Sequence, residues 1–250
     1  MSFVETNEIE RYKDDGYCLA QSLIPLDLME PARARVLDMV ENQPEWKDQS
    51  WQIMDPASGT NSKGETLPAG IQGPSKHEEV FNVIAKHPNI VEAMTDILGG
   101  EVEFFTDQIG LKHGFVDNEQ GMCSYYHQDS YYWNIEPNQG ANCWIPFQEV
   151  GPDNIALAVK PGTQRGWKLH EHETYNDDPT MGHMSDGNYH SFKRNRIPLA
   201  DVDFSDEIIY PMNTGDGLFF SNYTWHRSDP NRSGEDRLFY GIAYRLKQNN

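Results

Sequence analysis

The chain has 250 residues, of which 37% are hydrophobic and 12% aromatic, enough apolar material for the buried core of one large domain. Its 20 Lys and Arg against 39 Asp and Glu give a formal net charge of −19, which argues against nucleic acid and anionic membrane surfaces as partners. The same charge favours a cationic or zwitterionic small molecule, although an acidic surface that only maintains solubility would give the same composition.

The cysteines, Cys18, Cys123 and Cys143, are odd in number, far apart and without a CxxC pair, so they predict reduced thiols and not a disulfide framework or a zinc ribbon. The first residues lack the basic and apolar segments of a signal peptide, and no apolar run has the length of a membrane span. We therefore expect a cytoplasmic protein without a membrane segment.

Helices are predicted in residues 1–100. From Leu26 to Glu41, apolar side chains recur at three- and four-residue spacing with charges between them, the pattern of an amphipathic helix. The same pattern predicts a second helix from His87 to Leu98, which the Gly99-Gly100 pair would end. Residues 44–75 are rich in Pro, Gly, Ser, Asn and Asp, and they predict an extended loop.

From Glu101 onward, short apolar and aromatic runs alternate with turn-forming residues, which is typical of an antiparallel β protein. The predicted strands are 101–112, 122–128, 141–149, 155–160, 207–211, 216–221 and 236–246. We therefore expect a mainly β fold with flanking helices, in which a double-sheet jelly-roll core fills a single domain of residues 1–250.

Residues 170–196 fit neither the helical nor the strand period, and they are polar and rich in histidine. A long polar insertion in a compact domain is typical of a lid or of an ordered surface loop. As a lid, its acidic residues would clamp a polar or cationic group of a substrate; these are Glu171, Glu173, Asp177 and Asp178. A solvated loop without a ligand is the alternative.

A metal site is predicted from residues at two distant places in the chain. His127 and Asp129 lie in a strand-like segment, and residues two apart in a strand project from the same face. His226 follows a second predicted strand that begins near Gly215. Two imidazoles and one carboxylate are the facial triad that binds iron(II) and leaves open positions for other ligands. We predict His127, Asp129 and His226 as metal ligands and catalytic residues.

Further motifs accompany these residues in a fixed order. The chain has Tyr12-Lys-Asp-Asp-Gly16-Tyr17, His127-x-Asp129, Asn154-Ile-Ala-Leu before Pro161-Gly162-Thr163-Gln164, Gly215-Asp216, and His226-x-Ser228-x-x-Asn231-x-Ser233-x-x-x-Arg237. Together they resemble the phytanoyl-CoA dioxygenase (PhyH) family of iron(II)/2-oxoglutarate oxygenases over nearly the whole chain. Thr163 and Gln164 stand where that family usually has Ser and His, which leaves the role of this turn open.

The resemblance implies a double-stranded β-helix core of cupin-like type, with iron(II), 2-oxoglutarate and dioxygen as cofactor and cosubstrates. Arg237 would bind the distal carboxylate of 2-oxoglutarate, since a guanidinium can form a bidentate pair with it, and Ser228 would hydrogen-bond the same group. Lys112 and Trp133 would be further contacts near the cosubstrate. The alternatives are a surface ion pair for Arg237, a solvated strand position for Lys112 and core packing for Trp133.

Asp129 stands where related halogenases have Gly or Ala, so hydroxylation is favoured over halogenation. The resemblance implies hydroxylation of an unactivated C–H bond of a small polar metabolite in specialised or amino-acid-derived metabolism, with 2-oxoglutarate decarboxylated to succinate and carbon dioxide. Desaturation, N-dealkylation or ring formation with the same cofactors is an alternative outcome. A cupin-type isomerase or binding protein without 2-oxoglutarate is a further alternative. The presence of Arg237 with Ser228 argues against it, because such a protein has no reason to carry this pair. The sequence makes no prediction of the oligomeric state.

Overall fold

A computed structural model describes residues 3–54, 59–114, 124–152, 157–176, 181–185, 188–191, 193–229, 231 and 233–248. The helices are α1 (Thr6–Asp15), α2 (Leu26–Glu41), α3 (Glu79–Ala85), α4 (Pro88–Leu98) and α5 (Ser130–Trp133). The early strands are β1 (Tyr17–Ala20), β2 (Trp51–Met54), β3 (Pro68–Gln72), β4 (Val102–Lys112), β5 (Ser124–His127), β6 (Gly140–Pro146) and β7 (Ala158–Lys160). The later strands are β8 (Glu173–Asn176), β9 (Met181–Ser185), β10 (Asn188–Ser191), β11 (Arg194–Arg196), β12 (Ile208–Ile209), β13 (Gly217–Ser221), β14 (Trp225–Ser228) and β15 (Arg237–Leu246). Among these residues, no helix combines the length and the apolar character that a membrane crossing requires.

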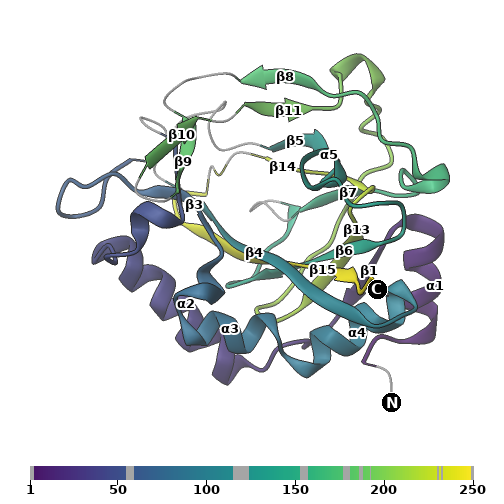
Figure 1. The fold of residues 1–250 in the computed structure, drawn as a ribbon, viewed down its shortest axis with the longest axis horizontal. Coiled ribbons are helices and arrows are strands. Elements are labelled where there is room, and N and C mark those ends of the chain that lie inside the picture. The colour runs from purple at the N-terminus through teal and green to yellow at the C-terminus, as the bar shows by residue number, and fades with distance from the viewer. Residues whose placement is uncertain are drawn as a thin grey trace.

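Two antiparallel sheets form the centre of the molecule (Figure 1). In the described part of the chain, the larger sheet has the order β1-β13-β6-β15-β4-β3-β2-β9-β10, and the smaller has the order β12-β7-β14-β5. β8 pairs with β11 beyond the smaller sheet (Figure 1). The fold class is thus mainly β with flanking helices, and its two sheets are those of a jelly-roll core.

The larger sheet separates two regions of buried apolar side chains. Helices α2, α3 and α4 run beneath this sheet (Figure 1), and the main core cluster lies between the helices and the sheet. A smaller cluster contains side chains from both sheets. β13 shows how alternation along a strand supplies both regions, because Phe219 belongs to the main core whereas Leu218 and Phe220 belong to the smaller cluster.

The turn at Pro161–Gln164 ties the N-terminal helix to the strand that carries His226. α1 ends at Gly16 with φ +83, where a Cβ would lie 2.4 Å from Thr224 Oγ1, so glycine is required by conformation and by space. The Gln164 side chain donates to the carbonyl oxygens of Lys13 and Asp14. Thr163 Oγ1 accepts a hydrogen bond from the Trp225 N–H at 2.9 Å. Thr163 and Gln164 therefore give this turn a structural role through their hydrogen bonds.

The strands predicted from Glu101 onward are present in the described residues with small differences at their ends, but two predictions for other segments were wrong. Residues 44–75 are not one extended loop, because they contain β2 and β3, and β3 pairs with β4 within the larger sheet. Residues 170–196 are not irregular, because they contain β8 to β11. Within that segment, β9 pairs with β2, so the two misjudged segments extend the same sheet together.

Candidate metal centre

The three predicted metal ligands come together at the interior side of the smaller sheet. His127 is the last residue of β5, and His226 lies opposite it in β14. One potential ligand atom from each of His127, Asp129 and His226 lies within 4.8 Å of the others, and these residues form the candidate metal cluster of the described part of the chain. Asp129 is not in a strand as predicted: it precedes α5 with φ −66 and ψ −31, so a helical turn and not strand alternation directs its carboxylate.

Backbone carbonyls set the orientation of both imidazoles. His127 Nδ1 lies 2.8 Å from the Tyr125 carbonyl oxygen, and His226 Nδ1 lies 3.1 Å from the Thr224 carbonyl oxygen. Because a carbonyl only accepts, each Nδ1 carries the proton and donates, which leaves the Nε2 lone pairs free to bind a metal. Each Nε2 lies 3.6 Å from one oxygen of Asp129, so the two nitrogens and the carboxylate converge.

Burial determines the charge of this group. It lowers the pKa of His127 to about 3, with the neighbouring His226 adding to the effect, and it lowers the pKa of His226 to about 4. Burial also raises the pKa of Asp129 to about 6, against the opposing effects of His127 and the Asn142 amide. At neutral pH the site therefore holds two neutral imidazoles and one buried carboxylate. This donor set suits a divalent transition metal, whose charge would balance the carboxylate.

Asn142 in β6 fixes the carboxylate from the opposite sheet. Its side-chain amide donates to Asp129 Oδ2 at 2.5 Å and to Asn222 Oδ1 at 3.0 Å. The Asn142 amide, which donates to the Asp129 carboxylate, is thus itself positioned by a hydrogen bond to the Asn222 side chain. Sequence analysis did not identify Asn142, because it lies within an otherwise apolar strand with no sequence relation to the ligands.

Gln128, between two of the ligands, is fully buried and bonded through every polar group of its side chain. Its amide nitrogen donates to the carbonyl oxygens of Lys168 and Tyr223, and its amide oxygen accepts from the His170 N–H. Its backbone N–H donates to His172 Nε2 at 3.1 Å. Gln128 therefore joins the ligand-bearing turn to residues 168–172 and to the chain just before His226. No sequence pattern around Gln128 indicates this role.

A recess next to the metal centre contains Arg237. The cavity at the triad, of about 130 Å³, and the recess share Trp144, Ser228 and Phe239 as walls. Arg237 is the first residue of β15 and lies opposite Lys112 of β4. Its side chain is only 13% exposed, and its buried Nε has no hydrogen-bond partner among the described residues, while the Glu235 carboxylate lies 3.7 Å from another guanidinium nitrogen. These surroundings differ from those of an ordinary surface ion pair.

Lys112 is buried at the same place and not solvated. Its ammonium donates to Ser228 Oγ and to the Asp229 carbonyl oxygen, both at 2.6 Å. It therefore orients the Ser228 hydroxyl, whose oxygen lies in the wall between the cavity and the recess. Lys112 is thus brought together with Ser228 and Arg237, which were predicted from a motif more than a hundred residues further along the chain.

Trp144 in β6 lies between the metal cavity and the Arg237 recess. Its indole N–H is buried, and no described residue accepts a hydrogen bond from it; the residue lines both the metal cavity and the Arg237 recess. A buried donor without a partner is costly unless a ligand supplies an acceptor. Trp133, predicted as a cosubstrate contact, lines the metal cavity and a second, outer cavity but not the Arg237 recess.

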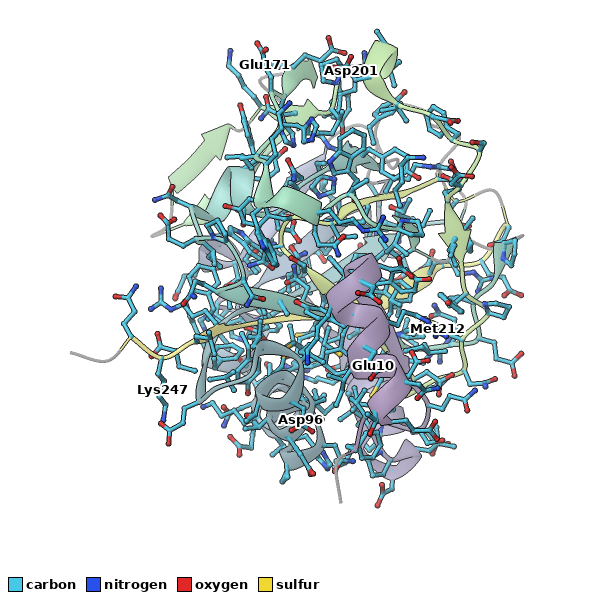
Figure 2. The ribbon with its side chains drawn as sticks, turned by 90° about the vertical axis from the view of Figure 1, so that its right-hand side faces the viewer. Glu10, Asp96, Glu171, Asp201, Met212 and Lys247 are labelled. Carbon is cyan, nitrogen blue, oxygen red and sulfur yellow. The ribbon has the colours of Figure 1, made fainter. Side chains whose placement is uncertain are left out.

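The described acidic residues of the predicted lid, Glu171 and Glu173, do not converge on the centre. Glu173 is exposed and pairs with Arg196 at 2.8 Å. Figure 2 shows Glu171 with Asp201 at one end of the molecule, opposite the end where Asp96 of α4 lies. Asp177 and Asp178 fall outside the described residues.

Comparisons with known proteins indicate the family and the fold of the chain. The model of the phytanoyl-CoA dioxygenase (PhyH) family matches residues 12–239. Among solved structures, AviO1 from Streptomyces viridochromogenes Tue57 is similar with a TM-score of 0.71 and 18% identity, covering 100% of this chain and 98% of that one. EctD from S. alaskensis, solved with 2-oxoglutarate and 5-hydroxyectoine, has a TM-score of 0.68 and 14% identity over 98% and 77% of the chains. The epimerase SnoN in complex with Fe3+, alpha ketoglutarate and nogalamycin RO has a TM-score of 0.67 and 16% identity over 96% and 82%. At these identities the likenesses show a shared fold.

Proposed function

The chain belongs to the phytanoyl-CoA dioxygenase family, and from this premise we propose that it is an iron(II)- and 2-oxoglutarate-dependent dioxygenase that hydroxylates an unactivated C–H bond of a small polar molecule. The observation that carries the proposal is the position of the Arg237 recess beside the metal cavity, with shared walls. A dicarboxylate that chelates a metal at one end needs a fixed cation at the other, and the recess offers one.

His127, Asp129 and His226 would hold the iron(II), because their ligand atoms converge and the two imidazoles stay neutral. The bound metal would supply dioxygen activation coupled to the oxidative decarboxylation of 2-oxoglutarate to succinate and carbon dioxide. Arg237 would pair with the distal carboxylate of 2-oxoglutarate, and the free N–H of Trp144 would donate to the same molecule. Ser228, oriented by Lys112, would donate its hydroxyl proton to that carboxylate.

Two observations bear on the alternatives. Asp129 occupies a metal-ligand position. This favours hydroxylation over halogenation, in which a halide would need that position on the metal. A cupin-type isomerase or binding protein would have no use for a largely buried arginine beside its metal, nor for an indole N–H to which no described residue offers an acceptor. Desaturation, N-dealkylation and ring formation would use the same residues, and the products formed from a substrate would distinguish them.

The proposal is tested by adding 2-oxoglutarate to the iron(II)-loaded protein without oxygen and recording the visible absorption band of the chelate. We expect the band with the unaltered chain and its loss in His226→Ala, which lacks a ligand. Arg237→Ala should bind iron normally and require about a hundredfold more 2-oxoglutarate, the cost of losing a charged pair in a recess. Arg245→Ala, which removes an arginine at the other end of β15 paired with Glu103, is the control and should behave as the unaltered chain.

If no band appears in the unaltered chain, or if Arg237→Ala loses iron as fully as His226→Ala, the assigned roles are wrong. With a band established, a screen of candidate metabolites for substrate-dependent succinate formation would then identify compounds that are turned over.

A further inference from the structure

An outer cavity of about 340 Å³ leads to the metal centre and shares no lining residue with the Arg237 recess. His127 and Asp129 form its inner end. Resting on the proposed function, we propose that this cavity binds the substrate, and that the part of the substrate bound here is an uncharged sugar ring. Glutamine amides would bind the hydroxyl groups of the ring, and aromatic side chains would pack against its C–H faces.

The glutamines come from three adjacent strands of the larger sheet. Gln52, Gln72 and Gln108 lie in β2, β3 and β4, and all three line the outer cavity. Gln72 and Gln108 lie opposite each other in the paired strands, and Gln72 Nε2 donates to Gln108 Oε1 at 2.9 Å. The Gln52 side chain lies over Gly70, where an added Cβ would collide with its amide oxygen. The glycine thus makes room for the third amide.

Much of the hydrogen-bonding capacity of these amides is unused. Among the described residues, none makes a hydrogen bond to the Gln52 amide, and the bond between Gln72 and Gln108 leaves the Gln108 amide nitrogen and the Gln72 amide oxygen available. Each amide offers donors and an acceptor, which suits a hydroxyl group because a hydroxyl both donates and accepts. An apolar substrate would leave these half-buried groups unsatisfied at a cost.

The passage from the outer cavity to the metal is lined by Gln72, Gln108 and Trp133, because these three residues border both the outer cavity and the metal cavity. Trp133 packs against Phe105 of β4, with the ring centroids 5.6 Å apart. A substrate that extends toward the metal must therefore lie against the paired amides and the indole. The hydroxyl groups held by these amides would be next to the C–H bond that reacts.

Two aromatic residues of α5, Tyr132 and Trp133, line the cavity. The Tyr132 hydroxyl donates to the Asn195 carbonyl oxygen and accepts from the Asn195 N–H, both at 3.1 Å. Because the hydroxyl is occupied, Tyr132 offers a ligand its ring. The face of an aromatic ring carries partial negative charge and attracts polarised C–H groups. Amides and ring faces together match a sugar ring, which has hydroxyl groups around its edge and C–H groups on its faces.

Charge has no part in the proposed recognition. Lys193 and Arg194 also line the cavity, but neither is without a partner in the protein, and the Arg194 guanidinium lies 5.4 Å from the centre of the Tyr175 ring. Hydrogen bonds would therefore dominate, and a charged group on the ligand should change its affinity little. An uncharged ligand also gains nothing from the formal net charge of −19, which had favoured a cationic or zwitterionic molecule.

The first test is binding of methyl pyranosides to the metal-free protein, measured by saturation-transfer NMR because it detects weak ligands. The probes are the methyl pyranosides of glucose, galactose and mannose, with tetrahydropyran-2-methanol as a similar ring that carries one hydroxyl group. We expect at least one glycoside to bind about tenfold or more tightly than tetrahydropyran-2-methanol, which can satisfy fewer amides. The uronic acid and amino-sugar analogues of that glycoside should differ from it by less than about threefold in affinity, as expected without a charged partner.

Variants assign the binding to residues. Gln52→Leu keeps a similar volume, removes no hydrogen bond made by the described residues, and should weaken the best glycoside about fivefold. Gln49→Leu, the same replacement at an exposed glutamine just before β2, is the matched control and should have no effect. Monodeoxy analogues of the glycoside complete the cycle: the analogue without the hydroxyl group that Gln52 binds should bind equally to the unaltered chain and to Gln52→Leu. Trp133→Leu should weaken the glycoside and all its monodeoxy analogues by a similar factor, because it removes a ring face and no amide.

Four results would overturn the inference. They are undetectable binding of every glycoside, binding of tetrahydropyran-2-methanol as tight as that of the glycosides, a threefold or larger gain in affinity from a charge on the ligand, and an equal effect of Gln52→Leu on all monodeoxy analogues.

Binding to the metal-free protein separates this inference from the proposed function. Glycoside binding that depends on Gln52, combined with no visible band on addition of 2-oxoglutarate to the iron(II) protein, would support the sugar site and contradict the proposed function. A visible band without binding of any glycoside would overturn only the inference. Where both are present, the glycoside should increase succinate formation by the iron(II) protein, and Gln52→Leu should raise the glycoside concentration that this requires. Unchanged succinate formation would mean that the bound sugar is not a substrate, and would overturn that part of the inference.

Discussion

His127 and His226 lie directly opposite each other in the paired strands β5 and β14, with their ring centroids 4.2 Å apart. This register brings together two imidazoles that are distant in the sequence, and it places both beside the one carboxylate of Asp129. Two rings so close would repel each other if both were protonated, which agrees with the lowered pKa of each histidine. The site is therefore preorganised as a neutral pair of nitrogen ligands with a single negative charge.

The buried carboxylate should reduce the stability of the metal-free protein. Burial raises the pKa of Asp129 to about 6 from the ordinary value of 3.8, so the penalty on the folded state begins as the pH rises above about 4 and reaches its full size above about pH 6. Asp129→Asn removes this charge and should raise the unfolding free energy of the metal-free protein at pH 7 by about 2 kcal/mol. The same variant should lose iron(II) binding. Chemical denaturation at pH 7 and at pH 4 measures the effect, and the gain should largely disappear at pH 4, where the unaltered carboxyl is already protonated.

The same pKa gives iron binding a defined pH dependence. A metal requires the deprotonated carboxylate, so iron(II) affinity should fall about tenfold per pH unit below about pH 6 and level off above it. Asn142→Leu removes the donor to Asp129 Oδ2 and should move this midpoint to higher pH, because that hydrogen bond stabilises the charged form. Titration of iron(II) at a series of pH values measures both midpoints. An unchanged midpoint in the variant would show that Asn142 does not control the carboxylate.

The free indole N–H of Trp144 should contribute to cosubstrate affinity. Trp144→Phe keeps an aromatic ring in the wall and removes the donor, and should raise the 2-oxoglutarate concentration for half-saturation by about tenfold, the value of one hydrogen bond to a charged group. Trp51→Phe is a matched control, because the Trp51 N–H is also buried without a partner but lies in the main core. Titration of the visible band compares the two variants. Equal weakening by both would mean that the effect comes from packing.

The sequence was informative where local pattern decides structure. The helix Leu26–Glu41 was predicted with its observed ends because its apolar spacing is helical over its whole length. Strands β13 and β15 were predicted because turn-forming residues bound their apolar runs. The metal ligands and Arg237 were predicted from the order of their motifs, which the family carries as a set.

The remaining features depend on contacts between distant segments. β3 begins with Pro68 and has no apolar alternation, so it becomes a strand only through its pairing with β4. β2 in turn pairs with β3 on one side and with β9 on the other. Neither of these neighbours was predicted as a strand, so no local pattern indicated that β2 would join the sheet. The hydrogen bonds of Asn142 to Asp129 and Asn222 likewise depend on tertiary placement, which no local sequence pattern expresses.

Gln128 should act as a positioning residue for the metal ligands on either side of it. Gln128→Ala removes three side-chain hydrogen bonds, to Lys168, His170 and Tyr223, and leaves their backbone groups without partners. It should lower the unfolding free energy by about 2 to 4 kcal/mol and weaken iron(II) binding by about tenfold to a hundredfold. Gln164→Ala is the matched control, since Gln164 is also buried and donates to the carbonyl oxygens of Lys13 and Asp14, away from the ligands. Denaturation should show that both variants are destabilised, whereas iron titration should show weaker binding only for Gln128→Ala. Hydrogen exchange adds a direct readout, because the His170 amide loses its acceptor in Gln128→Ala and should exchange faster there alone. If both variants bound iron equally well, the role of Gln128 would be confined to stability.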